Sequence, residues 1–123
     1  MGERFIIQGR LDGLNKLIQS NRQGWQAGAS CKKKNQRAVL EALLEHLPDY
    51  QTESPIRLNI AWYEENKKRD PDNVFFGVKY ILDGMVEFGT IQNDNQKYVK
   101  GITNELFVDK DNPRIEVEIE EVD

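Results

Sequence analysis

The chain has 123 residues, of which 38% are hydrophobic and 31% charged, and its formal net charge is −4. This length is typical of one compact domain, so we expect a single domain over residues 1–123. No stretch approaches the roughly 18 apolar residues that a membrane helix requires, and the N-terminus lacks the apolar segment of a signal peptide. We therefore expect a cytoplasmic protein with no membrane partner.

The first segment predicts a strand at residues 5–11, followed by a short helix that Asp12 would cap. The helical spacing is set by Leu11, Leu14, Leu17 and Ile18. Residues 20–30 are polar and contain two glycines, which indicates a break or a mobile loop.

A second helix is predicted around residues 40–47, where leucines recur at i, i+3, i+4 and i+7, and Pro48 ends it. A basic run lies near the expected start of this helix, where positive charge does not stabilise the helix dipole. Solvated surface lysines are the ordinary explanation of such a run, but its position favours a role toward a partner. The run consists of Lys32, Lys33, Lys34 and Arg37.

The single cysteine and the single histidine exclude an intrachain disulfide and a Cys/His zinc site. Cys31 has no base-and-orienter pattern around it, so we do not expect it to act as a nucleophile. Any metal in one chain must therefore be held by oxygen ligands, which favours magnesium, manganese or calcium.

Residues 56–62 alternate apolar and polar side chains and predict a strand with one buried face. A third helical stripe follows at residues 74–88, with Asp72 or Asn73 as its N-cap and Gly89 at its end. Strands are then predicted at residues 97–108 and 114–122. The sequence thus predicts an α+β domain with a small mixed sheet packed against two or three helices.

Charge is unevenly distributed along the chain. The last eight residues, Glu116 to Asp123, carry five acids and no base, and without them the net charge becomes +1. Bases gather elsewhere, at residues 32–37, 67–69 and 97–100. A face of the protein can therefore be positive enough to attract a polyanion although the whole chain is acidic.

The segment Asp70-Pro71-Asp72-Asn73 places two carboxylates two residues apart between a predicted strand and a predicted helix. Extended residues i and i+2 point to the same side, and Pro71 favours extended geometry at Asp70. Two such acids can share a hard divalent cation. The alternative is a capped turn, since Asp, Pro and Asn are common in turns and at helix N-termini.

The wider pattern is Asp70-x-Asp72-Asn73, then Lys79-x-x-x-Asp83, then Asn93-Asp94 after a glycine-bearing turn. This arrangement resembles that of the RusA-type Holliday-junction resolvases, small endonucleases of phage and prophage origin. The resemblance covers nearly the whole chain, including the N-terminal strand and the basic run. Two departures are a gap of about three extra residues before Lys79, and Asn93-Asp94 where some members have paired aspartates.

The resemblance implies a homodimer of mixed α/β subunits that uses Mg²⁺ or Mn²⁺ to cut four-way DNA junctions symmetrically during recombination and repair. By motif, the metal-binding and catalytic aspartates are Asp70, Asp72 and Asp94, and the active-site lysine is Lys79. Asp83 lies four residues after Lys79 and can simply pair with it on the helix. We place Asp83 outside the metal site and leave its role open.

Backbone phosphate contacts are expected from the exposed bases, and such contacts make binding depend on salt. Trp25 either anchors its loop or stacks on an unpaired base. The alternatives to a junction resolvase are a non-catalytic junction-binding protein, a structural calcium site and a branched-DNA nuclease with another substrate. The expected DNA-binding residues are Lys32, Lys33, Lys34, Arg37, Lys67, Lys68 and Arg69.

Overall fold

The computed structural model describes residues 2–123 and confirms the α+β class with a small mixed sheet. Within these residues the chain forms four helices and four strands, and one of the helices, α3, is only five residues long. In chain order the elements are β1 (Glu3–Gln8), α1 (Leu14–Arg22), α2 (Trp25–His46), β2 (Ile56–Glu64), α3 (Pro71–Phe75), α4 (Val78–Phe88), β3 (Val99–Val108) and β4 (Arg114–Glu121). None of the helices in the described part is long and apolar enough to cross a membrane.

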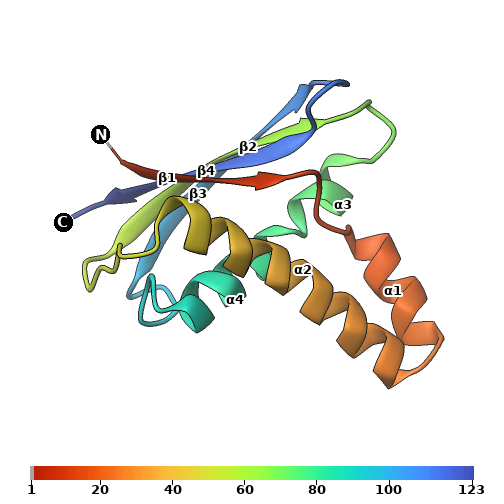
Figure 1. Ribbon diagram of the computed structural model, residues 1–123, viewed down its shortest axis with the longest axis horizontal. Coiled ribbons are helices and arrows are strands. Elements are labelled where there is room, and N and C mark those ends of the chain that lie inside the picture. Colours follow the sequence, from red (N-terminus) through yellow and green to blue (C-terminus); the bar gives the residue numbers. More distant parts are fainter. Residues whose placement is uncertain (1) are drawn as a thin grey trace.

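The sheet has the strand order β1-β4-β2-β3, and the helices lie along one of its faces (Figure 1). β4 pairs antiparallel with β1 and with β2, whereas β3 runs parallel to β2. A parallel connection requires a crossover, and α3 and α4 provide it. Val99 at the start of β3 therefore lies near Ile56 at the start of β2.

The core lies between the sheet and the helices. Alternation along β2 buries Ile56, Leu58, Ile60 and Trp62 against the helical layer. The opposite side chains of each strand form the outer face of the sheet, which no helix covers in Figure 1. Burial of one face therefore follows directly from the two-residue period of the sequence.

The acidic C-terminal segment is not a tail, because it forms most of β4, an inner strand of the sheet. Asn59 of β2 donates hydrogen bonds to Glu118 at 3.1 Å and to Glu120 at 2.8 Å. Arg4 of β1 lies 3.8 Å from Glu116 and 3.6 Å from Glu118. These acids are thus matched by neighbours on the outer face.

The break or mobile loop expected at residues 20–30 is confirmed only as a two-residue break, and the longer loop is wrong. α1 continues to Arg22 and α2 begins at Trp25, so only Gln23 and Gly24 separate the two helices. Gly24 has φ of 128°, a backbone conformation that suits glycine. The basic run consequently lies inside α2, more than one turn from its start, and the argument from the helix dipole does not apply to it.

The expected capping role of Asp12 is also wrong. The N-cap of α1 is Gly13, without a side-chain cap of its own. The side-chain oxygen of Asn73 accepts a hydrogen bond from the backbone amide of Asn15 at 3.0 Å and satisfies this helix end from across the molecule. Asp12 instead accepts a hydrogen bond from the Asn35 side-chain amide at 2.9 Å, which ties the chain before α1 to α2.

The helical stripe predicted at residues 74–88 is divided into α3 and α4 at Phe76 and Gly77. Gly77 lies against the ring of Trp62, where a Cβ atom would be 2.9 Å from the nearest ring carbon. The N-cap position of α3 belongs to Asp70, not to Asp72 or Asn73. The predicted end at Gly89 is confirmed, with φ of 93°.

Candidate active site

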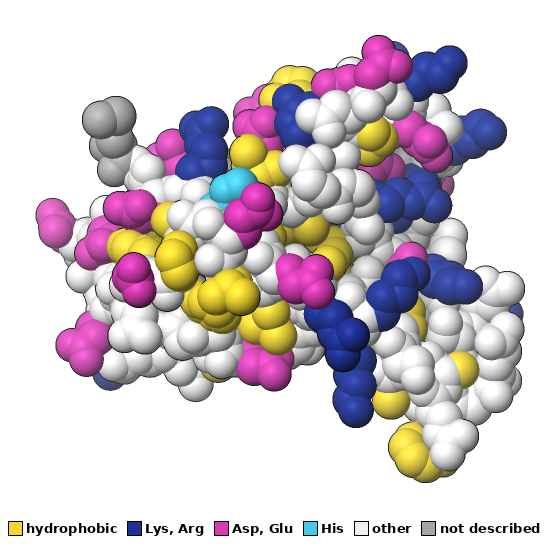
Figure 2. Space-filling model, viewed as in Figure 1, with side chains coloured by type: hydrophobic (Ala, Val, Ile, Leu, Met, Phe, Trp, Pro, Cys, Tyr) yellow, Lys and Arg dark blue, Asp and Glu magenta, His cyan; other side chains and the backbone are white. Residues whose placement is uncertain are grey.

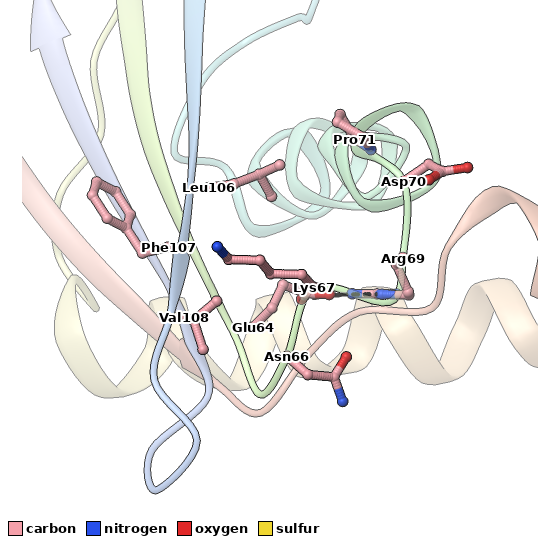
Figure 3. A pocket seen from close by; sticks show the side chains of 9 residues that line it. All are labelled: Glu64, Asn66, Lys67, Arg69, Asp70, Pro71, Leu106, Phe107 and Val108. Atoms are coloured by element: carbon pink, nitrogen blue, oxygen red, sulfur yellow. Dashed lines mark hydrogen bonds and ion pairs between the residues drawn. The ribbon is translucent and has the colours of Figure 1, made fainter.

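A buried ion pair shapes the loop between β2 and α3. The Arg69 guanidinium donates to both carboxylate oxygens of Glu64, at 2.8 and 2.7 Å, and its third nitrogen donates to the Leu11 carbonyl at 3.0 Å. The two side chains are only 14% and 9% exposed. Figure 3 shows this pair closing the loop immediately before Asp70. A bidentate pair of this kind fixes orientation as well as position.

Asp70 and Asp72 follow this clamp at once. Asp70 is extended, with φ of −71° and ψ of 154°, and Pro71 starts α3. Its carboxylate makes no capping hydrogen bond to the helix, and in Figure 3 it points away from the side chains of β3. Asp72 lies in the first helical turn, and both acids are exposed. The alternative explanation of this segment was a turn in which an acidic side chain caps the following helix. The Asp70 side chain does not make that cap.

Lys79 is the second residue of α4, and its ammonium group lies 3.4 Å from Asp83. This is the i, i+4 pair that the sequence offered as the ordinary role of Asp83. The Lys79 side chain is nevertheless 62% exposed. Lys32 of α2 lines the same cavity as Lys79 and Asp83, so a base of the predicted DNA-binding run lies near the predicted active-site lysine.

Asp94 lies at the other end of the β2–β3 pair. Its loop is tied to the residues before β2, because the Thr52 backbone amide donates to the Thr90 carbonyl at 3.0 Å and Gln92 donates to Glu53 at 3.0 Å. Asp70 instead follows the end of β2. A strand of nine residues, as β2 is, spans roughly 25–30 Å at about 3.3 Å per residue. One chain thus keeps Asp94 far from Asp70.

The predicted metal ligands are therefore not gathered as a triad in one chain. Within residues 2–123 no group of three or more His, Cys, Asp and Glu side chains is close enough to hold a metal ion. Asp70 and Asp72 are neighbours at one end of the sheet, and Asp94 is an exposed acid at the other.

The predicted DNA-binding residues differ in their surroundings. Six of the seven are exposed: Lys32, Lys33, Lys34, Arg37, Lys67 and Lys68. Of these, Lys34 lies 3.4 Å from Asp12. Arg69 is different, because all three guanidinium nitrogens donate to Glu64 or Leu11. Its surroundings give it a structural task that the basic sequence context did not indicate.

Sequence reasoning missed Glu64, the partner that holds Arg69. The signal was present, since the alternation Ile56, Leu58, Ile60, Trp62 places Glu64 on the buried face, and it is only 7% exposed. A buried acid requires a partner, and Arg69 is a nearby base. The alternation of β2 continues to Glu64, so it would have predicted that this acid is buried and paired with Arg69.

A second polar cluster anchors the helices beneath the site. The Cys31 thiol is buried, 3.6 Å from the Asp12 carboxylate and 4.0 Å from the Tyr80 hydroxyl. Burial alone would raise the pKa of Asp12, but hydrogen bonds from Asn35 and Lys34 and the Lys34 charge hold that pKa below its usual value. Burial and the neighbouring Cys31 raise the pKa of Tyr80. Cys31 thus belongs to a polar contact that joins α2, α4 and the segment before α1.

Comparison with known protein families gives one match. The family model described as endodeoxyribonuclease RusA matches residues 20–120, which include Asp70, Asp72, Lys79 and Asp94. A search among curated proteins found no match for the chain. The matched range begins in α1 and ends one residue before the end of β4, so it takes in β2 and β3 and nearly all of β4 but not β1.

Proposed function

Because this chain belongs to the RusA endodeoxyribonuclease family, we propose that it is a Mg²⁺- or Mn²⁺-dependent nuclease that cuts four-way DNA junctions in recombination and repair. The observation that carries the proposal is the pair Asp70 and Asp72, two exposed carboxylates held behind a buried ion pair and lying inside the matched segment. Acidic residues fixed on a rigid support and facing solvent are suited to binding a hard cation.

The residues present fit a hard divalent cation. The Asp70 carboxylate makes no hydrogen bond that caps α3, and both carboxylates lie on a short, constrained segment. Oxygen ligands favour Mg²⁺ or Mn²⁺ over softer metals. A cation held there would supply Lewis acidity toward a phosphate oxygen and an activated water. The protein's own part is to hold the two acids in place.

The position of Asp94 supports a site shared between two copies of the chain. One chain keeps Asp94 at the far end of the β2–β3 pair, so Asp94 would join Asp70 and Asp72 only from a second copy. A homodimer also suits the substrate, because two-fold symmetry in the enzyme matches symmetric cuts in the junction. In this arrangement each of two equivalent sites takes Asp70 and Asp72 from one subunit and Asp94 from the other.

Lys79, at the start of α4, would assist cleavage of the phosphodiester bond. Its side chain is exposed and its only ion pair within the described chain is with Asp83 on the same helix. An exposed i, i+4 pair contributes only about 0.3–0.5 kcal/mol, so a phosphate can displace it. Lys79 would then stabilise the negative charge that develops on the phosphate during cleavage.

The proposal is tested with Asp70→Asn and Asp72→Asn. Each change keeps the side-chain shape and removes a charge, so cleavage of a labelled four-way junction in Mg²⁺ should be abolished while junction binding in EDTA is retained. Asp111→Asn, in the exposed turn before β4, is the matched control and should cut normally. Full cleavage by the Asp70→Asn protein would refute the proposal.

The shared site is tested by subunit mixing. Asp70→Asn and Asp94→Asn proteins are each expected to be inactive. In a mixed dimer, a shared arrangement leaves one site with both changes and one site intact, so nicking of a single strand should return. If each site is built within one chain, every site in the mixture carries one change and no activity returns.

The alternative function is junction binding without catalysis. The exposed bases on α2 support it, since contacts to backbone phosphates give affinity without any need for cleavage. Addition of Mg²⁺ to a bound junction separates the two, because a binding protein leaves all four strands intact.

A further inference from the structure

The segment from Gly13 to Leu40 contains no acidic residue. It comprises α1 and the first two thirds of α2, so both arms of this helical hairpin carry positive charge only. Figure 2 shows blue side chains near the base of the hairpin and hydrophobic surface at its lower tip, whereas acidic side chains lie toward the left and along the top of the view. The bases of the segment are Lys16, Arg22, Lys32, Lys33, Lys34 and Arg37.

The hairpin is a firm structure that extends from the body. Only Gln23 and Gly24 join its two helices, and Gly28 packs against Asn21 so closely that a Cβ atom would collide with it. In Figure 1 the junction of α1 and α2 lies away from the strands. Between Leu17 and Cys31 no hydrophobic residue of the described chain belongs to the buried core. The tip is therefore not needed to build the core.

Trp25 occupies this tip. It is the first residue of α2 and is 80% exposed, whereas the other tryptophan, Trp62, is 1% exposed. The sequence left open whether Trp25 anchors its surroundings, and this exposure excludes that role within the chain. A large aromatic side chain held in water on a rigid hairpin has free ring faces for a partner.

We propose that the α1–α2 hairpin is a DNA-binding arm on which Trp25 stacks against unpaired bases of branched DNA. The inference deepens the proposed function and concerns binding rather than cleavage. Unpaired bases present flat ring faces, and stacking on an aromatic side chain does not depend on sequence. The lysines and arginines around Trp25 suit the phosphates on either side of such bases. A partner with a basic surface would be repelled by a segment without a single acid.

The arm and the proposed metal site lie on connected elements. Lys32 of the arm lines one cavity with Lys79 of α4, and Asn73 beside Asp72 accepts a hydrogen bond from Asn15 at the start of α1. A branch point held by the hairpin would thus be held relative to Asp70 and Asp72. We infer that the arm positions the unpaired region of the substrate.

Binding in EDTA tests the arm without requiring cleavage. Trp25→Ala should weaken affinity for a four-way junction with unpaired bases at its branch point by about 5- to 100-fold, the usual effect of losing one stacked base. It should change affinity for a fully paired duplex less than about twofold, since a duplex offers no unpaired base to stack, and Trp25→Phe should restore most of the junction affinity. Leu44→Ala is the matched control, because Leu44 is 63% exposed on the same helix but outside the acid-free segment.

Fluorescence gives an independent measurement, since Trp62 is 1% and Trp25 80% exposed, so that Trp25 should account for nearly all quenching by acrylamide. A junction should quench Trp25 emission and shield it from acrylamide, and a duplex should do neither. The inference is overturned if Trp25→Ala binds the junction normally, if Trp25 stays equally accessible in the complex, or if only anionic vesicles shield it. Loss of cleavage alone would not bear on it, so the arm and the nuclease proposal can fail separately.

Discussion

The outer face of the sheet and the α1–α2 hairpin both carry several bases, but the sheet pairs two of its arginines with acids, whereas most bases of the hairpin have no such partner within the described chain. Arg114 lies 2.9 Å from Asp109 and 2.8 Å from Glu116 and stacks on Tyr63 at 3.9 Å. Arg4 is likewise close to two glutamates. On the hairpin, within the described chain, only Lys34 has an acidic partner, at 3.4 Å.

The difference shows why the net charge of −4 is a poor guide to the partner of this protein. That figure adds an acid-rich strand, whose charges are largely met by neighbours, to a hairpin whose charges are not. A polyanion responds to local potential, which decays within about 10 Å at ordinary salt. The unpaired basic residues of the hairpin, and not the net charge of the whole chain, determine which partner can bind.

We expect the largest effect on stability from a change of Arg69. This residue belongs to a basic run in the sequence, but like the arginines of the sheet it is paired with an acid. Arg69→Ala would leave Glu64 buried without a partner, at a cost of about 3–5 kcal/mol in the free energy of unfolding. Urea denaturation measures this loss. Lys68→Ala, one residue away and exposed, should change stability by less than about 0.5 kcal/mol. Equal effects of the two changes would show that Arg69 is a surface base.

Lys79→Ala should reduce junction cleavage on the order of 100-fold, about 2.7 kcal/mol in the barrier, if the lysine stabilises charge in the transition state. Single-turnover rates at saturating enzyme measure this without a contribution from binding. Asp83→Asn removes only the partner of Lys79 and should cost much less. If Lys79→Ala alters only the affinity for DNA, the lysine belongs with the phosphate-binding bases.

Lys33 and Arg37 test the hairpin directly. Changing both to Gln should weaken junction binding by roughly tenfold, about 1.4 kcal/mol. The slope of log affinity against log salt should also become shallower by about 0.9 for each phosphate that the variant no longer neutralises. Arg4→Gln, on the outer face of the sheet, should leave both quantities unchanged. An equal response from Arg4 would remove the distinction between the two regions.

The smallest effects concern pH and compare an anchor of the hairpin, Asp12, with the contact between Tyr50 and Glu121 at the end of β4. Hydrogen bonds hold the pKa of Asp12 below its usual value despite its burial, so its contribution to stability is present above about pH 4 and is lost as the pH falls further. Burial and the hydrogen bond to Glu121 raise the pKa of Tyr50 from 10.0 to about 12, so that contribution is lost as the pH rises through this interval.

Melting temperatures measured across the pH range give a curve with an acid limb, where stability falls at low pH, and an alkaline limb, where stability falls at high pH. Asp12→Asn should flatten the acid limb and leave the alkaline limb, whereas Tyr50→Phe should flatten the alkaline limb only. A change of both limbs in either variant would contradict the assignment of each group.

Much of the fold followed from periodicity, because alternation over 56–62 and 114–122 and leucine spacing over 40–47 are strong local signals. The hairpin did not follow. Residues 20–30 are polar because the tip contributes nothing to the core, so the apolar stripe that marks a helix is missing there. Asp12 failed as a cap for a related reason, since its partner Asn35 is 23 residues away.

The site was predictable where it is local and unpredictable where it is not. Extended geometry at Asp70 follows from Pro71, and the structure agrees. The place of Asp94 depends on whether β3 runs parallel or antiparallel to β2, and no pattern within either strand reveals that. An antiparallel pair would have brought Asp94 to the same end as Asp70, whereas the observed parallel pair separates them.

The position of β4 has a consequence for how the protein forms. β4 is the last strand in chain order, yet it separates β1 from β2 and pairs with both. During synthesis β1 therefore has no sheet partner until β4 has left the ribosome, and the earlier strands must wait with open edges. Contacts so distant in sequence slow folding and leave the nascent chain prone to aggregation. Over that interval the two helices of the charged hairpin, which only Gln23 and Gly24 separate, can pack on each other without any later segment of the chain.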